Sequence, residues 1–221
     1  MIVHMKIIFI FTLPFLICLA CSPGYVRGLY IDTLLNRYNG LVKFTPCFDV
    51  HYDTVAGIRF KGTAGGKPLY VPVSSIERVV TGADTFIALP KGRVIGLNGH
   101  SVDHDLFARV VESGPLTLLR FCEIDYQATM IKVRRMEVQW YVVRRQDGLD
   151  GDVVPYSPAD FIALMGKHMS DDPVLCEEIR NANYVQKIAN PTPGCITEYE
   201  GVTEQQIRDF VKRYNSRRQG R

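Results

Sequence analysis

Between Gly24 and Tyr156 the hydrophobic positions recur in short runs, several of which alternate with polar positions. The runs are rich in β-branched and aromatic residues and are bounded by Gly, Pro, Asn or Asp, which is typical of β-strands. The predicted strands are Gly40–Phe44, Val55–Phe60, Leu69–Val73, Thr85–Leu89, Leu106–Glu112, Leu116–Asp125 and Val133–Arg145. Ser113–Pro115 predicts a tight hairpin connection, because Gly allows a positive φ and Pro fixes φ. We expect a meander.

After Gly148–Asp152 the pattern changes from strand to helix. Ser157-Pro158 and Ser170–Pro173 each place a capping residue before a proline, and Thr203–Gln206 is a capping box. We expect the second helix to carry Tyr184 inward, and Pro191–Gly194 to break the chain. The predicted fold class is α+β. An antiparallel β meander or partly closed barrel in residues 21–153 is followed by three short helices in 154–221, packed on the sheet.

We predict that residues 1–20 do not belong to the fold. Ile7–Ala20 is an apolar run of fourteen residues interrupted by Thr12 and Pro14. It is shorter than the roughly 20 residues of a membrane-spanning helix and is typical of a secretory signal peptide. Cys18-Leu19-Ala20-Cys21 resembles the lipobox of bacterial lipoproteins, so we expect acylation of Cys21 after cleavage. Cys18-Leu19-Ala20 also fits the cleavage site of an ordinary signal peptidase. This leaves a soluble secreted protein as an alternative.

The cysteines favour an oxidising compartment. Of the six cysteines, five follow Cys18, and acylation of Cys21 would leave four, namely Cys47, Cys122, Cys176 and Cys195. Four cysteines can form two disulfides. We expect Cys176 to pair with Cys195, with Cys47 and Cys122 as a second pair or as buried thiols. The alternative is that all four are small core residues. The chain has no CxxC motif, so neither a zinc ribbon nor a thioredoxin-like site is indicated.

The composition is that of an ordinary globular protein, with 47% hydrophobic and 22% charged residues. A net charge of +3 is too small to indicate nucleic acid as the main partner. Basic residues gather toward the end of the last predicted helix, at Lys212, Arg213, Arg217, Arg218 and Arg221. We expect a solvated helix end whose cations suit the helix dipole. The alternative is contact with anionic lipid head groups, which would reinforce an acyl anchor.

One segment has the residue types of a metal site. Within Asn98–Asp105, His100, Asp103 and His104 could ligate zinc. The alternative is a solvated polar turn, because Asn98-Gly99 marks a turn. The chain has no GxSxG, GxxxxGK[ST] or GxGxxG motif, so we expect no cofactor. For Trp140 we expect a core position, with an aromatic surface for a glycan or peptide as the alternative.

Several short motifs occur in a recognisable order: Ile31-Asp32-Thr33-Leu34, Asn39–Phe44, Tyr70–Ile76 and a closing Arg213-Tyr214-Asn215. In this order they resemble a family of exported, lipoprotein-like proteins of the Bacteroidetes without an established activity. That family typically has Gly where this chain has Ile31. The resemblance implies export and the fold, and it implies no reaction.

We therefore predict a non-enzymatic exported lipoprotein. A lipid on Cys21 would anchor it in the membrane, facing the periplasm or the cell surface. There it would act as an interaction or structural module, with an envelope protein as a candidate partner. The alternative function is a small periplasmic metal-dependent hydrolase that uses His100, Asp103 and His104.

Overall fold

The computed structural model describes residues 24–44, 47–49, 57–128, 133–148, 150–189 and 196–220, and for 47–49, 125–128, 133–136, 186–189 and 196–200 the backbone alone. The strands are β1 (Val26–Asp32), β2 (Arg37–Lys43), β3 (Cys47–Asp49), β4 (Gly57–Lys61), β5 (Leu69–Pro72), β6 (Ile76–Thr81), β7 (Asp84–Leu89), β8 (Val94–Ile95), β9 (Leu106–Glu112), β10 (Leu116–Ala128), β11 (Val133–Arg145), β12 (Gly151–Val153), β13 (Val185–Ala189) and β14 (Ile196–Glu200). A short 3-10 turn, Val73–Ser75, precedes β6, and the α-helices are α1 (Pro158–His168), α2 (Pro173–Arg180) and α3 (Glu204–Gln219).

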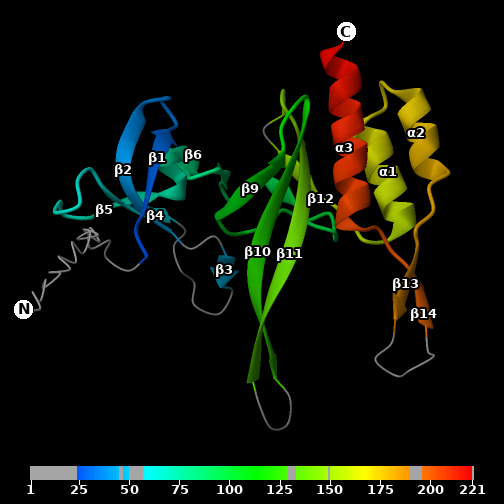
Figure 1. Ribbon diagram of the computed structural model, residues 1–221, viewed down its shortest axis with the longest axis horizontal. Coiled ribbons are helices and arrows are strands. Elements are labelled where there is room, and N and C mark those ends of the chain that lie inside the picture. The colour runs from blue at the N-terminus through cyan, green and yellow to red at the C-terminus, as the bar shows by residue number, and fades with distance from the viewer. Residues whose placement is uncertain are drawn as a thin grey trace, which may run out of the picture.

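Strands β1–β12 form one curled mixed sheet, whose main path has the order β5-β4-β2-β1-β6-β7-β9-β10-β11-β12-β8 (Figure 1). Neighbours along this path are antiparallel, except that β12 and β8 are parallel. Strands β13 and β14 pair with each other in a separate antiparallel two-stranded sheet. Strand β10 is thirteen residues long. On one of its edges β9 pairs with Leu118–Arg120, and β3 pairs in parallel with Cys122–Ile124. Three helices follow the sheet, so the predicted α+β class with a partly closed meander is confirmed.

Several predicted elements have the bounds expected from the sequence, and others were missed. Leu106–Glu112 and Val133–Arg145 are strands with the predicted bounds, and the capping box at Thr203 is present. Strands β1, β3, β6, β8, β12, β13 and β14 were not among the predicted strands. Tyr184 was expected on the second helix, but α2 ends at Arg180. The buried Tyr184 instead precedes β13 and donates from its hydroxyl to the Ile179 carbonyl at 2.6 Å.

Alternation along the strands gives the sheet two faces. One face carries a cluster around Tyr30, Val79 and Phe86 in the β1–β7 half. On the same face Leu118 and Tyr141 pack against the helices in a second cluster. The opposite face carries a third cluster, which includes Leu119 and Val142. The helices therefore cover one face of the sheet at its β10–β11 end only, as Figure 1 shows.

The helices are held to the sheet by apolar packing. Fully buried Phe161, Met165 and Ile207 share one cluster with residues of β10 and β11. The described residues after Val153 therefore bury apolar surface against β10 and β11 and complete the core at this end of the sheet. Within the described part of the chain, no helix is both long and apolar enough to cross a membrane.

Candidate functional site

The loop after β8 closes on itself as a tight turn. The Gly96 amide donates to the His100 carbonyl at 2.8 Å, and the Gly99 amide donates to the Gly96 carbonyl at 3.0 Å. Gly99 has a φ of +77°, a backbone conformation that a side chain would strain. The Asn98 side chain accepts from the His100 amide at 3.0 Å. The Asn98-Gly99 turn expected from the sequence is therefore formed.

The three predicted metal ligands are only partly brought together. Asp103 Oδ1 lies 3.3 Å from His104 Nδ1, but the Asp103 side chain is 98% exposed. His100 is exposed at the tip of the turn. Among the described residues, no three His, Cys, Asp or Glu side chains are grouped so that they could hold a metal ion. His100 and His104 are four residues apart and would share a face in a helix, but the segment that holds them is not helical.

Strand β10 supplies a residue that the sequence prediction missed. Glu123 Oε2 accepts from the Trp140 indole Nε1 at 2.7 Å, and its Oε1 lies 3.8 Å from His104 Nε2. The β10–β11 register pairs Phe121 with Trp140, so Glu123 stands diagonally opposite the indole on the same face. Asp103, His104, Glu123 and Trp140 therefore form one continuous polar row.

This row lines a pocket of about 370 Å³, which we call the loop pocket. Its other walls are Gly96, Leu97, Asn98, His100, Ser101, Val102, Phe121 and Val153. Trp140 is half-buried and packs on the third apolar cluster, so the expected core position holds only for part of the ring. A pocket that joins apolar walls with a few fixed polar groups is the usual form of a ligand site.

A second hollow of about 620 Å³ adjoins the loop pocket and shares Gly96, Leu97 and Val153 with it. Tyr156 lines this hollow and donates from its hydroxyl to the Gln139 carbonyl at 2.9 Å. The Tyr156 and Trp140 ring centroids are 6.4 Å apart. Leu97, which is 55% exposed, lines both hollows. The loop pocket and its neighbour thus present two aromatic rings on one side of the molecule.

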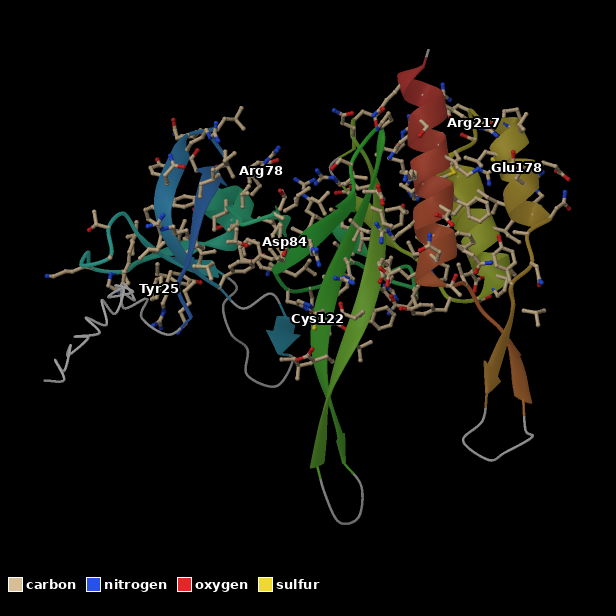
Figure 2. All side chains as sticks on the ribbon, in the orientation of Figure 1. Tyr25, Arg78, Asp84, Cys122, Glu178 and Arg217 are labelled. Carbon is tan, nitrogen blue, oxygen red and sulfur yellow. The ribbon has the colours of Figure 1, made fainter. Side chains whose placement is uncertain are left out.

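The cysteines differ from the first expected pairing. Cys176, expected to bond Cys195, is a free, buried thiol. It faces the cluster beneath α2, its Sγ donates to the Met169 carbonyl at 3.3 Å, and burial raises its pKa. Cys195 and Cys21 lie outside the described residues, as does the segment 1–20. The backbone register places Cys47 of β3 directly opposite Cys122 of β10, which Figure 2 shows beside β3.

Arg213, Arg217 and Arg218 are not a solvated helix end, whereas Lys212 is exposed and Arg221 lies outside the described residues. Arg217 contacts Asp172 at 3.1 Å and Glu178 at 2.8 Å, and Arg213 also pairs with Glu178. Figure 2 shows Arg217 and Glu178 between α3 and α2. Arg218 pairs with Asp171. These cations therefore hold α3 to the α1–α2 turn and to α2, which leaves them poorly placed for lipid head groups.

No known family model, curated protein or solved structure matches this chain. The fold and the loop pocket therefore have to be interpreted from their own residues.

Proposed function

We propose that this protein is an exported, lipid-anchored binding module of the cell envelope, without enzymatic activity, and that the loop pocket is its ligand site. The observation that carries the proposal is the fixed row of His104, Glu123 and Trp140 on the wall of that pocket. An indole whose N–H is already held by a carboxylate has a defined orientation, so its ring can serve as a preformed contact surface.

The lining favours a neutral oligosaccharide as ligand. Sugars offer apolar C–H faces, which stack on aromatic rings, and a rim of hydroxyl groups, which bind carboxylate, amide and imidazole groups. Trp140 and Tyr156 provide the rings, and Asn98, His100 and Asp103 provide hydrogen-bonding groups at the rim. The two adjoining hollows suit a chain of sugars better than a single ring.

Trp140 is the single tryptophan of the chain, so its fluorescence reports on the loop pocket. We expect an oligomer of N-acetylglucosamine to change its emission in a saturable way. Leu97→Ala should weaken this binding by about tenfold, because Leu97 lines both hollows. Leu34→Ala removes an equally large but distant side chain that is 80% exposed, and should leave binding unchanged. Equal affinity in wild type and Leu97→Ala would contradict the assignment.

The metal-dependent alternative is tested on the same protein. Thermal stabilisation by zinc that disappears in His104→Ala would support the hydrolase instead, because a metal that binds only the folded state stabilises it. The same result would count against the oligosaccharide site, because a zinc ion on His104 would occupy the wall of the loop pocket.

The anchor is tested by the intact mass of protein taken from native membranes. We expect the chain to begin at Cys21 and to carry acyl chains, and we expect both features to be lost in Cys21→Ser. This substitution removes only the thiol that would be acylated. An unmodified wild-type mass would rule out the anchor and would favour cleavage by an ordinary signal peptidase.

We also propose a disulfide between Cys47 and Cys122, which supports export to an oxidising compartment. Paired residues of adjacent strands have Cα atoms about 4.8 Å apart, within the roughly 4.4–6.8 Å range of disulfides. The register of β3 and β10 meets this condition. A non-reducing digest of the same membrane-derived protein should contain the Cys47 and Cys122 peptides linked together. Recovery of both as free thiols would contradict the pair.

A further inference from the structure

The N-terminal half of the sheet presents a basic surface that no described helix covers. Tyr30, Val42, Ile58 and Val79 are buried on one face of β1, β2, β4 and β6. The strand registers place the alternate residues on the other face, where the cations are Arg27, Arg37, Lys43, Arg59, Lys61 and Arg78. We call this surface the basic face. Figure 1 shows the helices at the opposite end of the sheet, so they do not cover it.

The charge of this region exceeds that of the whole chain. The described residues 24–44 and 57–81 contain seven Lys or Arg and two Asp or Glu, whereas the full chain has a net charge of only +3. Of the two acids, Asp32 is engaged at the β1–β2 turn, where it accepts from the Leu34 and Asn36 amides at 2.9 and 2.8 Å. Glu77 lies 4.0 Å from Arg78. The basic face therefore keeps a strong positive potential.

Apolar side chains lie between these cations. The registers place Leu29 and Ile31 of β1, Leu41 of β2 and Val80 of β6 on the basic face, and all four are half-buried. Arg27, Arg37 and Arg59 are exposed, and among the described residues they make no ion pair. A surface that mixes exposed cations with partly exposed aliphatic side chains matches the head-group region of an anionic bilayer.

A hollow of about 500 Å³ continues the basic face beyond β6. Arg78 and Arg144 line it together with Thr85, Thr117, Ser113 and Gln146. The Nε of Arg144 is buried and has no hydrogen-bond partner among the described residues. Two guanidinium groups beside hydroxyl and amide groups suit a phosphate, since guanidinium pairs with phosphate through two parallel hydrogen bonds.

We propose that the basic face and the Arg78–Arg144 hollow dock on an anionic phospholipid bilayer. The proposal rests on the lipid anchor proposed above, because the anchor would hold this half of the sheet against the membrane. Cys21 stands five residues before Val26, the first residue of β1, so the connecting chain spans at most about 18 Å. A single lipid chain binds membranes weakly and reversibly, and an adjacent basic cluster supplies the second contact.

The test uses the chain from residue 22 onward, which lacks the acylated cysteine. The three core clusters draw their members from within residues 30–214, so this chain retains the fold. We expect it to float with vesicles of phosphatidylglycerol and phosphatidylcholine and not with phosphatidylcholine alone. Binding should fall as salt is raised, because exposed charges are screened. Equal binding to both kinds of vesicle would overturn the proposal.

Charge reversal identifies the surface. Arg27→Glu, Arg37→Glu and Arg59→Glu combined should reduce binding to anionic vesicles by about tenfold or more. A control with the same change of net charge combines Lys91→Glu, Arg180→Glu and Lys212→Glu, which alter exposed residues outside the basic face. The control should bind like wild type, and an equal loss in both variants would refute the assignment of the face. Circular dichroism verifies that both are folded.

One further outcome is decisive. Retention on heparin without binding to anionic vesicles would assign the face to a soluble polyanion and would overturn the membrane proposal. The anchor is tested separately, since vesicle binding by the chain without Cys21 can succeed whether or not the mass of the native protein shows acylation.

Discussion

Replacing Asn215 with alanine should lower the free energy of unfolding by about 3 kcal/mol, because it leaves buried backbone groups without partners. The Asn215 Oδ1 accepts from the Leu116 amide at 2.9 Å, and its Nδ2 donates to the Leu116 carbonyl at 2.8 Å. Leu116 is fully buried, and the ladder between β9 and β10 begins only at Leu118. The Asn215 side chain therefore continues the ladder where β9 has ended.

The measurement is thermal unfolding followed by far-ultraviolet circular dichroism. For a chain of this length, a loss of about 3 kcal/mol corresponds to a Tm about 6–12 °C lower. Ser216→Ala is the matched control, because the neighbouring Ser216 hydroxyl donates only to the exposed Lys212 carbonyl on its own helix. Asn215→Asp should be at least as destabilising as Asn215→Ala, since it places a buried carboxylate oxygen against the Leu116 carbonyl. A Tm for Asn215→Ala close to that of Ser216→Ala would contradict this role.

The local pattern of hydrophobic residues was sufficient to predict strands whose own side chains form the core. Leu106–Glu112 and Val133–Arg145 are rich in β-branched and aromatic residues, and both were predicted with their observed bounds. Gly148–Asp152 was interpreted as a turn because Gly and Asp dominate it, so the strand Gly151–Val153 was missed. Gly151–Val153 is a strand because Gly151 lies so close to Val142 of β11 that a Cβ would come within 2.5 Å of Val142 Cγ1. The close approach of two strands depends on the partner strand. It therefore leaves no periodic pattern in the sequence of the segment itself.

The candidate site was predictable in part for the same reason. The turn at Asn98-Gly99 is local chemistry, and it was correctly expected as the alternative to a metal site. Glu123 meets His104 only because β10 passes beneath the loop, and it meets Trp140 only through the β10–β11 register. Pairing across strands far apart in the sequence cannot be inferred from spacing alone. The C-terminal arginines illustrate the same limit, since their acidic partners lie on α2 and in the turn before it.

Replacing Phe161 with alanine is the second change with a large expected effect. Phe161 is fully buried, and its ring centroid lies 6.0 Å from that of Tyr184 and 6.2 Å from that of Phe210. It shares its cluster with Leu118 and Tyr141 of the sheet. Removing a buried phenyl ring costs about 3–5 kcal/mol, because the transfer free energy is lost and a cavity remains.

Because this cluster joins helix and sheet, the loss should weaken the whole molecule in one transition. Far-ultraviolet circular dichroism and Trp140 fluorescence should therefore give the same lowered midpoint for Phe161→Ala, since Trp140 lies on β11. Leu34→Ala removes a side chain that is 80% exposed and should change stability by less than about 0.5 kcal/mol. A helix signal lost at lower temperature, with Trp140 fluorescence unchanged from wild type, would instead make the segment after Val153 a separate folding unit. In that case the interpretation of the helices as part of the sheet's own core would be wrong.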